Sequence, residues 1–231
     1  MKGLHLLSPR LHYWLHQNRF EVLLFALVML QFNKIFFPDN QTYLSIVWPA
    51  NMLIVGLASI GIFKDRSKLE SWFKNILFAI TAFIPFVFET VAQQPPLMYG
   101  MLIVYVLYYV LLLVETLRQI SNPEEVTLSV LFGSFCGYLL LVLVALFSFL
   151  LVEYHCPKSF HGLTGGHVGE VYSQMSYFSF VAMTTIGFGD IYPESDSARL
   201  LTAFFAVLGQ FYMVGLVGIL ISRFTGSPAK K

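Results

Sequence analysis

The chain alternates between long apolar stretches and short polar connections. Six stretches are long enough, or nearly so, to cross a hydrocarbon layer of about 30 Å, which takes about 20 helical residues. They run approximately over Phe20–Phe37, Tyr43–Phe63, Asn75–Ala92, Leu97–Leu117, Val126–Val152 and Leu200–Phe224. Helices are expected because a backbone exposed to lipid must satisfy its own hydrogen bonds. The pattern predicts an all-α membrane protein with six transmembrane helices.

The connection between the last two stretches differs from the others. It begins polar and Gly-rich over Glu153–Glu170 and then turns apolar over Tyr172–Thr184. The apolar part makes a helix of about 20 Å, which is too short to cross the membrane. We therefore expect a re-entrant helix that dips in and returns, followed by Gly-rich backbone lining a water-filled path.

Composition agrees with lipid as the solvent, because the chain is 57% hydrophobic and only 12% charged. A net charge of +1 without a long basic cluster argues against a nucleic-acid partner. No array of nucleophile, base and orienting acid and no phosphate-cradling loop suggests an enzyme or a cofactor. Cys136 and Cys156 would lie roughly 30 Å apart on one helix, so free thiols are expected.

The distribution of positive charge predicts the orientation, because Lys and Arg favour the cytoplasmic side. With the N-terminus inside, the outer side holds only Lys34, Lys158 and Arg199. The inner side holds Lys2, Arg10, Arg19, Lys64, Arg66, Lys68, Lys74, Arg118, Arg223, Lys230 and Lys231. This asymmetry predicts a multi-pass protein of the cell membrane with both termini cytoplasmic.

The candidate chemistry lies directly after the expected re-entrant helix, in Thr185-Ile186-Gly187-Phe188-Gly189. A dehydrated cation crosses only if backbone carbonyls from several chains replace its water. Gly187 and Gly189 accept the unusual dihedrals that point carbonyls toward one axis. Thr185 adds a hydroxyl oxygen at the inner end. Ile186 and Phe188 would turn their side chains away and pack behind the strand.

With Asp190 following, this segment resembles the Thr-Val-Gly-Tyr-Gly signature of the potassium-channel family, which is also the standard example of a carbonyl filter. The helix layout around it resembles a six-transmembrane, prokaryotic-type subunit with a voltage-gated-like arrangement. The resemblance implies a homotetramer in the lipid bilayer, with K⁺ bound at Thr185, Ile186, Gly187 and Phe188 as the permeant ion.

Several residues around the signature are expected to support the filter. Where many relatives carry adjacent tryptophans, this chain has Tyr177 and Phe178. We expect the Tyr177 hydroxyl to bond the Asp190 carboxylate and brace the outer filter. Further supporting residues are expected to be Thr184, Val181 and Glu153.

Two of these positions keep an alternative reading. Gly209 occupies the place of a glycine hinge in family inner helices, and it could equally be a small residue for close helix packing. Glu153 resembles an acid behind the pore, and it could also be an ordinary charged helix end. His155, His161 and His167 share the outer loop with Cys156, which permits proton or zinc modulation; loosely placed histidines fit the spacing better.

The chain divides into four parts: 1–19 as a cytoplasmic or interfacial N-terminus, 20–120 as a four-helix peripheral domain, 121–224 as the pore domain and 225–231 as a short cytoplasmic tail. The peripheral domain has the place of a voltage sensor without its chemistry. A sensor moves several arginines across the field, and Leu97–Leu117 has none. Steep voltage gating by this helix is not expected.

The sequence therefore predicts a tetrameric, potassium-selective channel without arginine-based voltage sensing. Two rivals remain. Phe188 lacks the tyrosine hydroxyl of many relatives, so a less rigid filter would give a weakly selective cation channel. A non-conducting membrane sensor or scaffold with a channel-like shape is the second rival.

Overall fold

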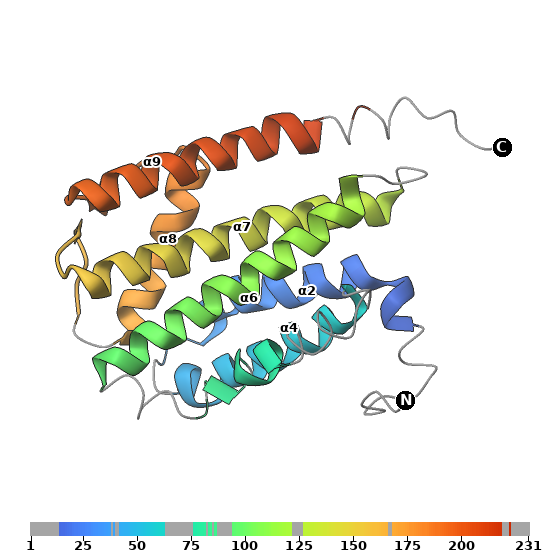
Figure 1. Ribbon diagram of the computed structural model, residues 1–231, viewed down its shortest axis with the longest axis horizontal. Helices are drawn as coiled ribbons and strands as arrows, with labels where there is room; N and C mark the ends of the chain where they lie inside the picture. Colours follow the sequence, from blue (N-terminus) through green and yellow to red (C-terminus); the bar gives the residue numbers. More distant parts are fainter. Residues whose placement is uncertain are drawn as a thin grey trace.

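The computed structural model is a bundle of helices with one helix set across the others (Figure 1). The structure describes residues 14–37, 39, 42–62, 76–81, 83, 84, 86, 94–121, 127–165, 168–218 and 222. Its main helices are α2 (Arg19–Phe32), α4 (Trp48–Ile62), α6 (Pro95–Ser121), α7 (Leu128–His155), α8 (Val168–Met183) and α9 (Asp196–Phe211). Helix α7 is central, because α2, α6, α8 and α9 all pack against it.

Shorter elements complete the described fold. They are the 3₁₀ turn η1 (Asn33–Phe36), the π-helical turns η2 (Tyr43–Val47) and η3 (Tyr212–Val217), and the strands β1 (Phe160–His161) and β2 (Tyr192–Pro193). The strands pair antiparallel, with Phe160 opposite Pro193 and His161 opposite Tyr192. This small sheet joins the loop after α7 to the loop before α9.

Four helices are long and apolar enough to cross a membrane, among the residues that the structure describes. They are Ser45–Ile62, Pro96–Ser121, Leu128–His155 and Asp196–Gly215. They match the second, fourth, fifth and sixth predicted stretches, so a multi-pass membrane protein is supported. Most of the third stretch, Asn75–Ala92, lies outside the described residues. The six-span layout stays a prediction.

The first predicted stretch, Phe20–Phe37, differs in detail. Its α-helix ends at Phe32 and tightens into η1. Within η1, the buried Asn33 amide exchanges two hydrogen bonds with Asn51 of α4, at 2.9 and 3.2 Å. A buried amide is costly without partners, so this pair links α2 to α4. Hydropathy alone does not reveal such a pairing.

The last two helices begin earlier than the hydropathy pattern predicts. α8 begins at Val168 rather than Tyr172, and Glu170 lies in its first turn, where the helix dipole favours an acid. α9 begins at Asp196 rather than Leu200, because Ser195 caps it: the Ser195 hydroxyl accepts a hydrogen bond from the Ala198 N–H at 3.3 Å.

The core between α6 and α7 is built from aromatic rings. Phe147 of α7 is 1% exposed and stacks on Tyr105 and Tyr109 of α6, with ring centroids 4.8 and 5.4 Å apart. Tyr105 and Tyr109 are also stacked on each other at 6.3 Å. Large rings in close contact have strong dispersion attraction, so this cluster holds α6 against α7.

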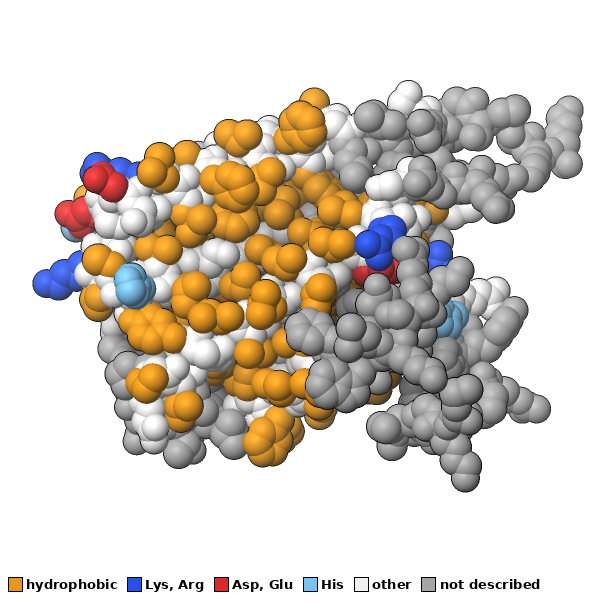
Figure 2. All heavy atoms as spheres, in the orientation of Figure 1, with side chains coloured by type: hydrophobic (Ala, Val, Ile, Leu, Met, Phe, Trp, Pro, Cys, Tyr) orange, Lys and Arg blue, Asp and Glu red, His pale blue; other side chains and the backbone are white. Residues whose placement is uncertain are grey.

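The surface has the polarity of a membrane protein. Figure 2 shows hydrophobic side chains spread across the middle of one face, with charged side chains and histidines toward its two ends. An apolar face of this extent is unusual for a protein surrounded by water. The first turns of α2 and the end of η3 lie at the same end of the bundle, and the end of α7 and the start of α9 lie at the other (Figure 1).

Removing the central ring should weaken the bundle. Phe147→Ala leaves a cavity beside Tyr105 and Tyr109, and we expect it to lower the free energy of unfolding by about 3 kcal/mol. Phe135→Ala, on the exposed face of the same helix, should change it by less than about 0.5 kcal/mol. Thermal unfolding in detergent measures both, and equal stability of the two variants would contradict the assignment of this core.

Candidate functional site

The loop that follows α8 has an alternating backbone. Thr185, Gly187 and Gly189 have φ angles of 59°, 61° and 82°, whereas Ile186 and Phe188 between them are not left-handed. In an ordinary strand, successive residues face opposite sides. Reversing the handedness at every second residue turns successive carbonyls to the same side. The segment thus has the backbone geometry that a carbonyl filter requires.

The strained start of this segment is tied to the end of α8. Thr185 is β-branched, and a left-handed conformation costs such a residue about 1–3 kcal/mol. The N–H groups of Ile186 and Gly187 both reach the Val181 carbonyl, at 3.0 and 3.4 Å. The Thr184 hydroxyl donates to the helix carbonyl four residues earlier, at 2.7 Å. Carbonyls at the end of α8 are therefore satisfied by the segment itself.

The outer half of the segment lies beside Tyr177. The Phe188 ring is parallel to the Tyr177 ring, with centroids 6.5 Å apart and an interplanar angle of 2°. Tyr177 and Asp190 line the same open cavity of about 350 Å³. Partial desolvation and then the neighbouring Asp190 carboxylate raise the pKa of the Tyr177 hydroxyl. The two groups are thus close enough to interact, and the bond between them stays a prediction.

The predicted packing behind the strand is only partly present within one chain. Phe188 is 69% exposed despite the Tyr177 contact, and Ile186 is 56% exposed. A Cβ added at Gly187 or Gly189 would meet no atom within 4 Å. Their conformation, rather than lack of space within this chain, explains why glycine suits both positions.

Phe178, next to Tyr177, points into the protein instead. It is buried, and its ring lies 5.3 Å from both Phe149 of α7 and Phe160 of β1. Phe149 also contacts Phe205 of α9, at 5.5 Å. The two adjacent aromatic residues thus have different contacts. Tyr177 faces the signature segment, and Phe178 packs α8 against α7 and β1.

Glu153 holds the outer loop to the end of α7. Its two carboxylate oxygens accept hydrogen bonds from the backbone N–H groups of Lys158, at 2.8 Å, and Phe160, at 3.0 Å. Phe160 belongs to β1, and β1 pairs with β2 just after the signature segment. Glu153 is therefore more than an ordinary charged residue at a helix end, because it binds the backbone of the loop that follows.

Two further residues at this outer rim were missed by sequence reasoning. The Gln174 side chain accepts from the Thr164 N–H at 2.8 Å and donates to the Thr164 carbonyl at 2.6 Å. Gly162 has a φ of 85°, and a Cβ there would clash with the Asp190 carbonyl. For Gln174, the available signal was a single glutamine in an apolar helix. The role of Gly162 depends on a contact with Asp190, which is distant in sequence.

Gly209 lies where α9 crosses the end of α8. A Cβ at this buried position would lie 3.0 Å from the carbonyl oxygen of Met183 and 3.1 Å from the Cε atom of the Met183 side chain. The backbone contact explains the small residue by close packing. The hinge role stays a prediction, although the helix does widen into the π-helical η3 from Tyr212 onward.

The histidines of the outer loop do not gather into a metal site in the described part of the chain, where no three His, Cys, Asp or Glu residues could hold an ion. His161 stacks on Tyr192 at 4.7 Å and its Nδ1 atom lies 3.8 Å from a Glu194 oxygen. His155 contacts the Tyr99 ring at 6.1 Å, and His167 lies outside the described residues. Cys136 and Cys156 do not bridge to each other: Cys136 is buried and Cys156 is exposed.

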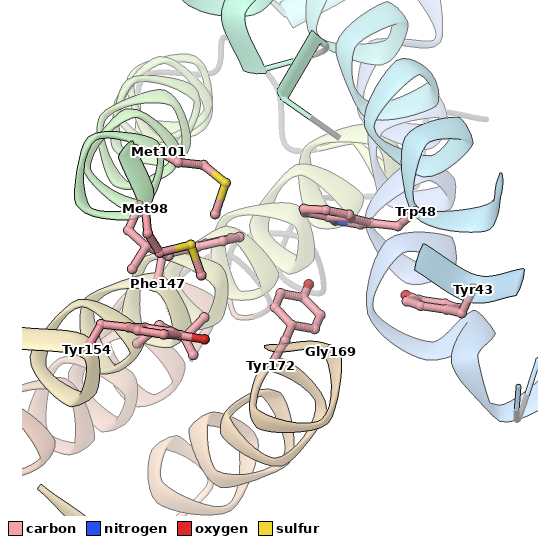
Figure 3. A pocket seen from close by; sticks show the side chains of 10 residues that line it. Tyr43, Trp48, Met98, Met101, Phe147, Tyr154, Gly169 and Tyr172 are labelled. Carbon is pink, nitrogen blue, oxygen red and sulfur yellow. The ribbon is translucent and has the colours of Figure 1, made fainter. Parts of the chain in front are cut away.

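An apolar pocket joins the start of α8 to the peripheral helices. Figure 3 shows Met98 and Met101 of α6 extending into it, with Trp48 of α4 and Tyr172 of α8 on other sides. The Trp48 and Tyr172 rings lie 6.4 Å apart. Methionine fills irregular gaps with little penalty for shape change. The start of α8 therefore rests on an adaptable apolar contact.

Helix α8, which is not among the helices long enough to cross a membrane, is followed by the alternating segment and then by the span-length helix that begins at Asp196. In a comparison with known proteins, residues 137–226 match the protein family described as "Ion channel". This range begins within α7 and includes α8, the signature segment and α9.

Two curated plant proteins are similar to parts of the chain. Two-pore potassium channel 4 of Arabidopsis thaliana is 26% identical over 103 residues, which cover 45% of this chain and 36% of that protein. Two pore potassium channel b of Oryza sativa subsp. japonica is 45% identical over 47 residues, 20% of this chain and 12% of that protein. The chain thus matches 36% of the first relative's length and 12% of the second's. These similarities support a potassium-channel family.

No solved structure matches the chain.

The two readings of Gly209 predict different outcomes for Gly209→Ala. Close packing predicts a loss of stability of about 1–3 kcal/mol, because the Met183 carbonyl must shift. Gly215→Ala is the matched control, since its Cβ would meet only the Phe211 ring at 3.8 Å. Thermal unfolding measures the stability of both variants. Unchanged stability together with altered channel opening in Gly209→Ala would favour the hinge.

Proposed function

We propose that the chain is one subunit of a homotetrameric, potassium-selective channel that conducts K⁺ passively. The backbone carbonyls of Thr185, Ile186, Gly187 and Phe188 bind the dehydrated ion, and the Thr185 hydroxyl contributes at the inner end. The observation that carries this proposal is the alternation of handedness at Thr185, Gly187 and Gly189. This alternation would bring no benefit to a non-conducting scaffold, because it strains the Thr185 backbone without adding a packing contact.

Four copies are proposed because a single strand cannot encircle an ion. Support comes from α9 and η3, which leave a row of apolar side chains largely exposed at alternating spacings of four and three residues: Leu200, Phe204, Val207, Phe211 and Val214. Such a row occupies one face of a helix. A hollow of about 470 Å³ on this side is lined by Thr185 together with α9 residues. In a tetramer it would open below the filter.

Conduction follows from the exchange of water for carbonyl oxygens. An ion entering the ring of four segments loses its water and gains oxygens at successive levels, so that neither entry nor exit carries a large barrier. The role of the protein is to keep those oxygens directed at the axis. On the inner side the Val181 carbonyl holds the segment in place, because it accepts hydrogen bonds from the N–H groups of Ile186 and Gly187. We propose that Tyr177 and Asp190 hold it on the outer side.

Voltage sensing by moving arginines is not part of the proposal. Along α6 the cationic side chain is Arg118, in the last turn, where it pairs with Glu115 at 3.1 Å. Glu115 also accepts from Gln119 at 3.1 Å, so both partners are fixed near one end of the helix. A paired charge near the end of a helix crosses little of the membrane field. Both termini are proposed to be cytoplasmic.

A weakly selective cation channel is the second candidate. The observation that favours it is the exposure of Phe188. Its ring lacks a hydroxyl and, among the described residues, stacks on the Tyr177 ring alone. A looser filter ring would admit Na⁺ more readily. Reversal potentials in mixed K⁺ and Na⁺ solutions distinguish the two candidates.

Gly187→Ala tests the proposal. An alanine at φ 61° costs roughly 1–2 kcal/mol, so the segment should leave its alternating conformation and lose potassium flux into liposomes by at least about tenfold. Gly100→Ala is the matched control. It lies in α6 with no atom near its Cβ and no left-handed φ, and its flux should equal that of the wild type.

The pattern of flux separates the candidates. Potassium flux that exceeds sodium flux and is lost in Gly187→Ala supports the proposed channel. Equal sodium and potassium flux supports the weakly selective channel. Equal potassium flux in Gly187→Ala and wild type would show that the segment is not the filter.

Tyr177→Phe tests the outer brace. The change removes the hydroxyl beside Asp190 and keeps the ring against Phe188. Losing a hydrogen bond to a charged group costs roughly 1.5–3 kcal/mol, so potassium current should decline faster during sustained conduction. Tyr192→Phe, an exposed tyrosine outside the segment, should behave as the wild type. Current recordings that coincide for both variants and the wild type would remove Tyr177 from the filter.

A further inference from the structure

A groove of about 470 Å³ lies between the end of α2 and one face of α8. Gln31 and Lys34 line it from α2 and η1, and Ser173 and Ser176 line it from α8. Tyr43 lies at its edge and also borders the apolar pocket of Figure 3. The groove therefore adjoins the pore region without belonging to the signature segment.

Two serine hydroxyls in this groove are available to a ligand. In the described helices, serine and threonine hydroxyls commonly donate to a carbonyl one turn earlier, as Ser179 of α8 does to Met175 at 2.7 Å. Within the same described region, no hydrogen bond is formed by the hydroxyls of Ser173 or Ser176, which are half-buried. The two serines are one turn apart, on the face of α8 that lines the groove.

The groove also holds a cation. The Lys34 ammonium lies 5.4 Å from the centre of the Tyr43 ring, and it forms no ion pair with the described residues. Glu170 attracts it at longer range but does not line the groove. A cation on a tyrosine face, partly removed from water, still has capacity for an anion.

Gln31 borders the groove but offers it no acceptor. The Gln31 Nε2 group donates to the Leu139 carbonyl at 3.4 Å, whereas its Oε1 atom is buried with no partner among the described residues. An enclosed oxygen cannot accept a hydrogen bond from a ligand, so the groove offers the cation and the two hydroxyl donors, which suit an anion.

The remaining walls are apolar. Phe32 and Phe180 contact each other across the groove, with ring centroids 5.1 Å apart, and Ile35 is largely exposed beside them. From Phe32 an exposed apolar row continues down α2 through Val28 and Phe25, about 10 Å at 1.5 Å per residue. Polar groups at one end and an apolar track leading away from them match an amphiphilic molecule.

We propose that this groove binds an anionic phospholipid, with its phosphate at Lys34 and the two serine hydroxyls and an acyl chain along α2. Charge complementarity with Lys34 selects an anionic headgroup, such as that of phosphatidylglycerol. The lipid would join α2 to α8. It thereby supplies a bond between a peripheral helix and the helix that holds the signature segment.

Lipid retained by the purified full-length protein tests this proposal without any measurement of ion flux, so its outcome is independent of the proposed function. Protein is equilibrated with mixed micelles of equal phosphatidylglycerol and phosphatidylcholine, washed in detergent and assayed by mass spectrometry. The wild type should retain phosphatidylglycerol preferentially. Lys34→Gln should lower that preference about fivefold, the effect of one basic residue on an anionic lipid, and Lys34→Arg should keep it.

Lys158→Gln is the matched control, because it removes the same charge from the exposed outer loop and should retain lipid as the wild type does. The double variant Ser173→Ala with Ser176→Ala should also reduce phosphatidylglycerol retention. All comparisons use protein that elutes at the wild-type volume. Equal retention of both lipids by wild type and Lys34→Arg overturns the proposal. Unchanged retention in Lys34→Gln also overturns it.

Discussion

The alternating backbone of Thr185–Gly189 is the constraint on which the rest of the structure depends. Carbonyl oxygens that all point one way repel one another and make no hydrogen bonds with their own segment. Such a strand persists only when its surroundings hold it. Here the N–H groups of Ile186 and Gly187 are bound by the Val181 carbonyl, so the end of α8 serves as the base of the segment.

The elements around this base form two supports. On the outer side, Glu153 binds the loop that contains β1, and β1 pairs with β2 immediately after the segment. On the inner side, α9 crosses the end of α8 at Gly209. It is then joined to α7 by Tyr212, whose hydroxyl donates to the Ser134 carbonyl at 2.8 Å. Both supports converge on α7, against which α2 and α6 also pack.

Much of this could be predicted from the sequence. Long apolar stretches predicted the four helices that are long enough to cross a membrane, and the short apolar stretch before the signature predicted a helix where α8 lies. That α8 is re-entrant stays a prediction. The signature glycines pointed to left-handed backbone, and Gly187 and Gly189 have it. Thr185 was expected to supply a hydroxyl; its left-handed conformation was not foreseen, since β-branched residues rarely adopt it.

The remainder depends on contacts between residues far apart in the chain. Nothing in the sequence near Gln174 specifies Thr164 as its partner, and the pairing of Asn33 with Asn51 requires two helices to be placed first. The starts of α8 and α9 were missed because hydropathy does not register a polar cap such as Ser195. Packing and caps, rather than hydrophobic pattern, determine these features.

The most direct test of the central claim is to locate ions in the assembled protein by anomalous X-ray scattering from crystals grown with Rb⁺ in place of K⁺. The account predicts a row of anomalous peaks on the tetramer axis, at the level of Thr185 to Phe188, that disappears when Na⁺ replaces Rb⁺. An axis without ordered Rb⁺, or carbonyls of this segment turned away from it, would contradict the account.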